Sequence, residues 1–508
     1  MASTFVVSRS QLTYALCLPL AVLIGYFLAE PLESGSIAIV VFVLSVLSLP
    51  LLMKWYHPLL VMSWNAFICP VFLPGRPMLW MVMSVLGLGI AILNRSVNPH
   101  KRFINIPSLT RPLVFLVGVV IITAGLTGGI GLASLGGSRY GGKGYFFILA
   151  AVAGYFALTS QRIPPERAGL YVALFFLSGL TALVSQVAAL LGPAADFLFI
   201  IFPGAPGAMQ SSPGGSPGGG NDFSRLGSFM IAAPAIYGYL LARFGVQGTL
   251  DLRHPGRLLI FLLALLGCAW CGYRSALVML VISFAAVFYW EGLHRTKLLP
   301  ALIGLALLAG SAVLPYADRL PLVMQRSLSF LPIKVDFEVR QSADSTTEWR
   351  IEMWKRLLPD IPKYLLKGKG YVLTPDDLYW ANQNALRSGE GAGGAMVAGD
   401  YHSGPLSTII PFGIWGVIGF VWFWVAGLRF LYHNYQFGDP ALRRINTLLM
   451  ALFGAKIIFF LLIFGAFYSD LIQFTGLVGL AVSLNGPPDA RAPREAPEEA
   501  LSRFSLRV

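Results

Sequence analysis

The chain has 508 residues, of which 56% are hydrophobic and only 12% are charged, and its formal net charge is +13. This composition, with a mean hydropathy of +0.69, is typical of a polytopic membrane protein and excludes a soluble two-domain protein. A charge of +13 would indicate nucleic-acid binding in a soluble protein, but most basic residues here lie between apolar runs, where they orient membrane helices, so nucleic acid is not an expected partner.

Fourteen apolar segments approach the roughly 20 residues that a membrane-spanning helix needs. In chain order they are 12–29, 36–53, 57–74, 77–94, 112–129, 144–160, 168–192, 227–243, 257–273, 275–291, 299–315, 406–428, 446–467 and 471–485. Because several are short or contain Gly and Pro, they predict an all-α polytopic membrane protein with about 12–14 transmembrane helices. The first segment lacks a small-residue cleavage site after its apolar run, so we expect a retained helix rather than a signal peptide.

These segments divide the chain into four regions. Residues 1–315 hold predicted transmembrane helices 1–11 with short loops, 316–405 form one large polar loop, 406–485 hold the C-terminal transmembrane helices, and 486–508 form a tail. The four cysteines lie in apolar runs, which indicates neither a disulfide framework nor a metal cluster. The Cys268-x-x-Cys271 spacing would suit a redox pair, but we favour two small side chains packed in a helix.

Basic residues are distributed unequally between the two sides that this topology defines. The side that holds both termini carries twenty Lys and Arg residues, whereas the short loops of the other side carry only Arg76, Arg139, Lys143, Arg225 and Arg274. Because Lys and Arg concentrate in cytoplasmic loops, both termini are predicted to be cytoplasmic and the loop 316–405 to lie outside, with the tail 486–508 inside. Of the six histidines, His402 alone then faces outward.

His402 lies where the large loop re-enters the membrane, and two interpretations of it remain open. It is a polar residue at the start of a helix, or it is a general base, since an imidazole takes up protons near neutral pH. Arg225, Arg274 and Arg350 are on the same predicted side. Each arginine singly fits a snorkelling side chain, but three together suit a pyrophosphate on a lipid carrier, whose oxygens a guanidinium binds bidentately.

Three stretches resemble a known family. His402-Ser403, followed by Gly413 and Gly416, looks like the histidine motif of bacterial O-antigen ligases and the related O-antigen polymerases and O-oligosaccharyltransferases. Residues 272–276, Gly-Tyr-Arg-Ser-Ala, are similar to the Ser-Arg-Gly-Ala turn of that family, and residues 225–229 resemble its Arg-x-x-Gly-Thr-Phe stretch. The resemblance covers roughly residues 222–467; Tyr273 stands where the family has Ser, and Ser403 where Asn is common.

The resemblance implies a GT-C-like, metal-independent inverting glycosyltransferase of the bacterial inner membrane, with its active site on the periplasmic side. Such an enzyme is expected to move a glycan from undecaprenyl diphosphate to a hydroxyl of lipid A core or of another acceptor, without a metal or other cofactor. His402 is then the expected base, and Arg225, Arg274 and, as a further candidate, Arg350 bind the diphosphate. Asp222, Glu348 and Asp400 are candidates for contacting the acceptor or orienting His402, although solvated loop carboxylates are the favoured alternative.

Other functions remain open. A polymerase of O antigen or exopolysaccharide, from the same family, is one alternative; a flippase or transporter of a lipid-linked glycan is another, and a structural scaffold is a third. Lys456 favours transport, because a lysine inside an apolar segment is a functional candidate by default. A structural pairing of Lys456 with a backbone carbonyl or a lipid phosphate would explain it equally well.

Overall fold

The computed structural model describes residues 18–19, 21–22, 25, 34–71, 73, 75–98, 103–128, 142–204, 226–388 and 399–488. The chain divides into two compact units, Met1–His57 and Pro58–Val508, and the second unit holds the helical bundle. All regular elements among the described residues are helices, with no strand.

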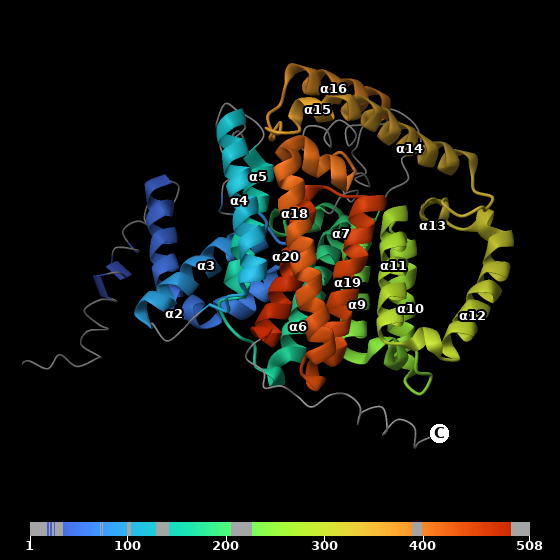
Figure 1. Ribbon diagram of the computed structural model, residues 1–508, viewed down its shortest axis with the longest axis horizontal. Coiled ribbons are helices and arrows are strands. Elements are labelled where there is room, and N and C mark those ends of the chain that lie inside the picture. Colours follow the sequence, from blue (N-terminus) through green and yellow to red (C-terminus); the bar gives the residue numbers. More distant parts are fainter. Residues whose placement is uncertain are drawn as a thin grey trace, which may run out of the picture. The chain divides into compact units, whose positions relative to one another are not determined.

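Eighteen α-helices follow one another in the described residues (Figure 1). They are α2 (Ser34–Ser63), α3 (Leu79–Val97), α4 (Pro107–Thr127), α5 (Gly142–Leu158), α6 (Ala168–Leu177), α7 (Ala182–Leu191), α8 (Leu198–Ile201), α9 (Gly227–Thr249), α10 (Pro255–Ala269), α11 (Arg274–Trp290), α12 (Leu298–Val313), α13 (Leu322–Leu328), α14 (Phe337–Leu357), α15 (Ile361–Tyr364), α16 (Pro375–Ser388), α18 (Gly404–Phe437), α19 (Arg443–Leu462) and α20 (Phe467–Asn485). Short 3-10 helices join several of them: η2 (Pro165–Arg167), η3 (Ser178–Thr181), η4 (Gly192–Ala195), η6 (Leu293–Arg295), η7 (Leu314–Arg319), η8 (Leu358–Asp360) and η9 (Pro440–Leu442).

Eight described helical stretches are long and apolar enough to cross a membrane. They are Leu79–Val97, Pro107–Thr127, Pro165–Ala195, Gly227–Thr249, Leu298–Arg319, Gly404–Phe437, Pro440–Leu462 and Phe467–Asn485. Three further apolar helices, α5, α10 and α11, have 17, 15 and 17 residues. At about 1.5 Å per residue they are shorter than a hydrocarbon core of about 30 Å. The predicted all-helical, multi-pass membrane architecture is confirmed, while the count of 12–14 spans stays a prediction. Most of the first segment, 12–29, lies outside the described residues.

The predicted segment 57–74 is wrong as a separate helix. Helix α2 continues to Ser63, and the described residues between 64 and 78 form no helix. Pro70, Pro74 and Pro77 disfavour a new helix in the second half of this stretch, because proline lacks a backbone N–H. The backbone of residues 64–78 forms hydrogen bonds with distant segments instead. For example, the N–H of Cys69 donates to the carbonyl of Ile201 at 2.8 Å.

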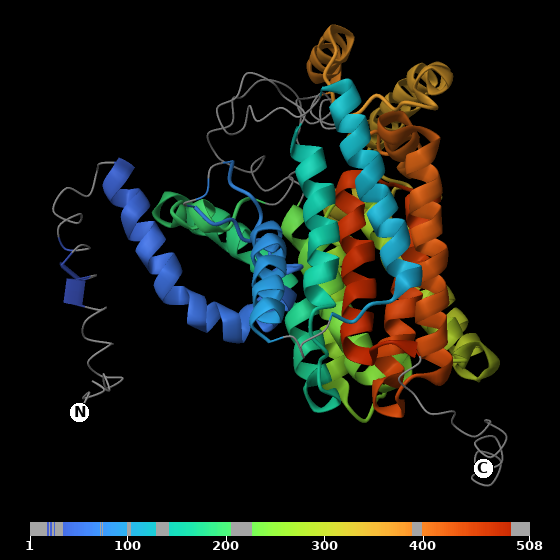
Figure 2. The same ribbon diagram turned by 60° about the vertical axis from the view of Figure 1, so that its left-hand side comes forward.

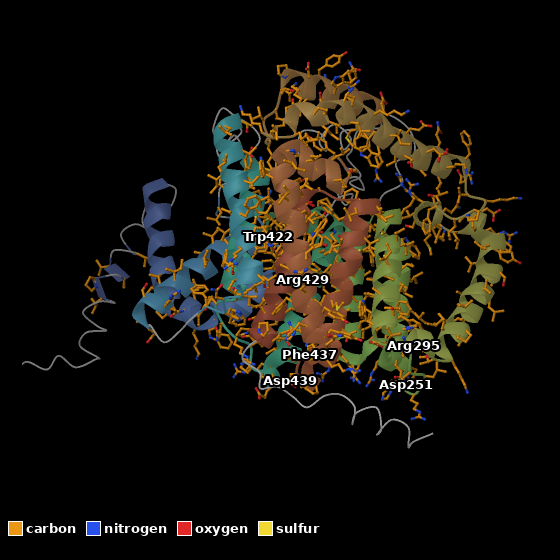
Figure 3. All side chains as sticks on the ribbon, viewed as in Figure 1. Asp251, Arg295, Trp422, Arg429, Phe437 and Asp439 are labelled. Atoms are coloured by element: carbon orange, nitrogen blue, oxygen red, sulfur yellow. The ribbon has the colours of Figure 1, made fainter. Side chains whose placement is uncertain are left out.

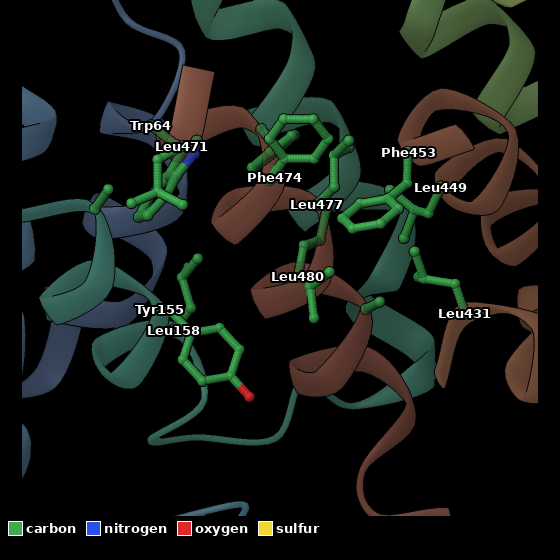
Figure 4. Packing of buried hydrophobic residues seen from close by; sticks show 14 of the residues in the cluster. Trp64, Tyr155, Leu158, Leu431, Leu449, Phe453, Leu471, Phe474, Leu477 and Leu480 are labelled. Atoms are coloured by element: carbon green, nitrogen blue, oxygen red, sulfur yellow. The ribbon is translucent and has the colours of Figure 1, made fainter. Parts of the chain in front are cut away.

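Helix α20 lies at the centre of the bundle and is the most deeply buried of the eight spans. Of its 18-residue apolar stretch, 78% is buried inside the protein. A helix that is apolar on every face is expected to be buried. Gly476 and Gly479 let neighbouring helices approach, because a Cβ at either position would collide with Trp64 or Leu158. Figure 4 shows the side chains around α20, which include Trp64, Tyr155, Leu158, Leu431, Leu449, Phe453, Leu471, Phe474, Leu477 and Leu480.

The two ends of the bundle carry different loops. Helices α14 and α16 lie across one end (Figures 1 and 2). Asp251, Arg295 and Asp439, in the turns after α9, α11 and α18, lie at the opposite end (Figure 3). The turns that the charge pattern assigns to the cytoplasm are thus separated by the length of the bundle from the segment that precedes His402.

A small apolar cluster joins α14 to the start of α18. Its buried members are Trp349, Met353, Leu357, Tyr401, Leu406 and Ile410. The indole N–H of Trp354 donates to the carbonyl of Tyr401 at 2.8 Å, directly before His402. The segment between α12 and α18 therefore packs against the bundle at Tyr401, next to His402.

Helix α18 is broken at Gly413, which lies two residues after Pro411 and has φ 62°. The break frees backbone groups that a second segment satisfies: the N–H of Gly370 donates to the carbonyl of Pro411 at 2.9 Å, and the N–H of Ile414 donates to that of Leu365 at 2.7 Å. Gly413 of the histidine motif is thus needed because segment 365–370 packs against α18 at this position.

Gly413→Ala is expected to lower the apparent melting temperature of the purified protein by several degrees. Alanine at this positive φ costs about 1–2 kcal/mol, and its Cβ would collide with the Leu365 carbonyl oxygen. Gly454→Ala, in α19, is the matched control, because no atom lies within 4 Å of its Cβ position. That variant should melt at the wild-type temperature or above it, since Ala is the better helix former. Equal melting of the two variants would contradict this role of Gly413.

Candidate active site

His402 lies directly before the N-cap residue of α18 and has a strained backbone. Its φ of 52° makes it one of two non-glycine residues with positive φ in the described part of the chain. Asp400 fixes this conformation, because one carboxylate oxygen accepts from the His402 backbone N–H at 2.9 Å and lies 3.1 Å from Nδ1 of its ring. Strained backbone of this kind concentrates at functional sites.

The contact with Asp400 also determines which nitrogen of the His402 ring carries the proton. A carboxylate only accepts hydrogen bonds, so Nδ1 carries the proton in this contact, and in the neutral ring Nε2 is left as the acceptor. Ser403, the N-cap of α18, makes no side-chain capping bond, and the ring of His402 bonds to Asp400 rather than to the first N–H groups of α18. The helix-cap interpretation of His402 therefore has no geometric support.

Aromatic side chains hold the His402 ring on two sides. Its centroid lies 5.2 Å from that of Trp349 on α14 and 4.8 Å from that of Phe464, in the loop between α19 and α20, both edge to face. The guanidinium carbon of Arg350 lies 5.8 Å from the centre of the same Phe464 ring. The side chain of His402 is 21% exposed, so it is held but remains accessible.

Arg274 opens α11 and reaches α14. Its guanidinium donates to the carbonyl of Ala343 at 3.2 Å and lies 3.4 Å from the hydroxyl oxygen of Thr347. Both partners lie within about two turns of Arg350 on the same helix. A positive side chain at a helix N-terminus gains nothing from the helix dipole, so its position there does not serve the stability of α11.

The other predicted site residues divide into two groups. Asp400 is brought to His402, whereas Glu348 is exposed on α14 beside Trp349. Asp222 and Arg225 lie outside the described residues. Burial raises the pKa of Tyr401 and that of Tyr371, so both phenols stay protonated and neither replaces His402 as a base.

Lys456 has a partner that the sequence interpretation missed. Its Nζ lies 2.7 Å from Oδ1 of Asp470 on α20, and both side chains are only 7% exposed. Neither a backbone carbonyl nor a lipid phosphate is therefore needed to explain this lysine, since a buried charge is tolerated when a carboxylate neutralises it. The pair accounts for Lys456 structurally and leaves the transporter alternative untested.

An apolar pocket of about 470 Å³ opens beside the histidine. Ser403, the residue after His402, lines it, and its other walls come from α14, η8, α15, α18 and α19. They include Trp354, Leu358, Ile361, Leu406, Phe420, Val421, Trp424, Phe460 and Leu461. No cluster of three or more His, Cys, Asp or Glu side chains within the described ranges is placed to hold a metal ion.

The family model for O-antigen ligase, Wzy_C, matches residues 259–421. The match includes the Arg274 turn, α14 with Arg350, the break at Gly413 and His402 with its partner Asp400. No curated protein matches the chain. The chain is thus a multi-pass membrane protein whose residues 259–421 match the O-antigen ligase family model.

Proposed function

We propose that the protein transfers a glycan from undecaprenyl diphosphate to the hydroxyl of an acceptor, as an inverting, GT-C-like glycosyltransferase. The observation that carries the proposal is the placement of one accessible imidazole, held by Asp400, beside an apolar pocket and an arginine-bearing helix. The family match supports glycan transfer over transport or a scaffold.

In this mechanism Nε2 of His402 takes the proton of the acceptor hydroxyl as its oxygen attacks the anomeric carbon. The new C–O bond forms on the face opposite the diphosphate, whose own bond to the anomeric carbon breaks, so the linkage inverts. Asp400 holds the ring in the required tautomer and stabilises the imidazolium. The released lipid diphosphate then carries the additional negative charge.

Arginine side chains stabilise this leaving group. Arg274 and Arg350 are the described candidates, and Arg225 is a third that lies outside the described residues. A guanidinium offers paired donors that match phosphate oxygens, and the N-terminus of α11 adds its dipole at Arg274. We propose no metal ion for this step, because fixed guanidinium charge supplies the same stabilisation.

We propose that the isoprenoid units nearest the diphosphate lie in the apolar pocket, whose volume of about 470 Å³ is too small for the whole chain. Its wall begins at Ser403 beside the proposed base and continues along α18 as far as Trp424, 21 residues on. A polyprenyl chain in this pocket would place its diphosphate at the end where His402 lies.

We assign the site to the periplasmic side of a bacterial inner membrane, in the loop 316–405. From Arg95 onward, eighteen basic residues of the side assigned to the cytoplasm stand against Arg139, Lys143, Arg225 and Arg274, a count that does not depend on segment 57–74. This asymmetry supports the orientation, as does the separation of α14 and α16 from the turns at Asp251, Arg295 and Asp439. For the acceptor, lipid A core defines a ligase and a second lipid-linked glycan a polymerase. Glu348 and Asp222 are the proposed acceptor contacts.

Purified protein incubated with undecaprenyl-diphosphate glycan tests this function. Separate reactions contain lipid A core, excess lipid-linked glycan or a hydroxyl-bearing peptide, each with EDTA or with Mg²⁺. We expect a new glycosidic bond of inverted configuration with one acceptor, formed equally well in EDTA, and formed in right-side-out vesicles from acceptor added outside. Movement of intact donor across vesicles without a new bond would favour a flippase, and strict dependence on a divalent ion would overturn the metal-independent mechanism.

A further inference from the structure

Phe464 lies against both the proposed base, His402, and Arg350, a proposed diphosphate ligand. Its ring lies 4.8 Å from the His402 ring and 5.8 Å from the guanidinium carbon of Arg350. His402 belongs to the start of α18 and Arg350 to α14, so neither helix alone sets the distance between them. Phe464 lies outside residues 259–421, in the short loop that joins α19 to α20.

The loop that carries Phe464 is held from both sides. On one side the hydroxyl of Ser407, in the first turn of α18, donates to the carbonyl of Gly465 at 3.1 Å. On the other side the N–H of Ala466 donates to Oδ2 of Asp470 at 2.8 Å, while Oδ1 of the same carboxylate pairs with Lys456 at 2.7 Å. One buried carboxylate thus ties the loop to α20 and to α19 together.

A buried ion pair is weak evidence for a role in stability. Replacing a buried pair by apolar side chains of similar volume is often neutral or stabilising, because both charges lose their hydration. The pair does, however, fix geometry, since Lys456 reaches Asp470 from a helix whose last turn also closes the loop. The carbonyl of Phe459 in that turn accepts from the N–H groups of Ile463 and Phe464 at 2.9 and 3.0 Å.

We propose that Phe464 is a positioning residue that sets the His402 ring relative to Arg350, and that the Lys456–Asp470 pair fixes the loop that presents it. This inference rests on the proposed function, in which His402 faces the acceptor and Arg350 the leaving diphosphate. Both groups must be correctly placed in one transition state, and a shift of about 1 Å lowers a rate by up to roughly a hundredfold. The loop 463–466 is therefore part of the site, although it lies more than forty residues beyond the matched stretch.

Phe464→Leu tests the positioning role in the transfer assay. The expected result is a kcat lower by roughly tenfold to a hundredfold with the donor KM nearly unchanged, and recovery of most of the rate in Phe464→Tyr, which keeps a ring. Phe453→Leu is the matched control: Phe453 lies on α19, is fully buried, and packs on Phe423 and Phe474. It should lower the melting temperature at least as much and leave kcat intact.

The ion pair is tested through its coupling to Phe464. The double variant Lys456→Met, Asp470→Asn is neutral and keeps an oxygen that accepts from Ala466. It should lower kcat to a similar degree, and adding Phe464→Leu to it should cause little further loss, since both act on one arrangement. Losses that multiply would overturn the role of the pair. A wild-type rate in Phe464→Leu overturns the positioning role alone, whereas a wild-type protein that forms no product overturns the proposed function itself.

Discussion

Replacement of His402 by asparagine is expected to reduce glycan transfer by about a hundredfold to ten-thousandfold, the range found when a positioned general base is removed. Asparagine tolerates the left-handed backbone that His402 adopts at φ 52°, so the chain at the start of α18 should keep its conformation. It is also a capable helix cap, yet it has no basic nitrogen. The substitution therefore removes the proposed chemistry and leaves the local fold in place.

The measurement compares His402→Asn and His402→Ala for membrane abundance, donor binding and turnover. Both variants should reach the membrane in normal amounts, bind the lipid-linked donor and form almost no product. Alanine adds backbone strain of about 1–2 kcal/mol at this φ, so it should be the less stable of the two. Near-normal turnover in His402→Asn would show that His402 is structural and that the base must be sought among Asp400, Glu348 and Asp222.

The helical architecture could be predicted from the sequence because a helix that spans a membrane needs a run of about 20 mainly apolar residues. The prediction was wrong at 57–74, where composition alone suggested a span. The described residues after Ser63 form no helix there, and the backbone N–H of Cys69 bonds to the carbonyl of Ile201, which lies 132 residues later. Such a partner leaves no periodic signal in the local sequence.

The candidate site was predictable only in its individual residues. The spacing of His402, Gly413 and Gly416 and the turn at Arg274 singled out residues that the structure places on neighbouring elements. The contacts among them depend on tertiary packing. Asp470 approaches Lys456 because α19 and α20 lie side by side. Phe464 reaches His402 because the loop between α19 and α20 packs against the start of α18. A phenylalanine at the end of an apolar helix resembles any other lipid-facing or core residue in the sequence, so nothing marked Phe464 as part of the site.

Substitution of Arg274 by alanine is expected to lower the rate of transfer by about a hundredfold to a thousandfold, as the loss of one preorganised donor to a developing anion does. Arg274→Lys keeps the charge but loses the planar pair of donors, so we expect an intermediate rate rather than recovery. The assay measures kcat and the donor KM for both variants. It also compares lipid-diphosphate and lipid-monophosphate ligands in binding.

Arg274 also bonds to α14, so a control must separate that structural contact from diphosphate binding. Thr347→Val removes the hydroxyl that lies 3.4 Å from the guanidinium and keeps the arginine itself. If Arg274 binds the diphosphate, Thr347→Val should retain most of the wild-type rate, and only the Arg274 variants should lose their preference for a diphosphate over a monophosphate lipid. Equal losses in Thr347→Val and Arg274→Ala, with that preference intact, would mean that Arg274 acts by holding α14 over the site and that the leaving group depends on Arg350 and Arg225.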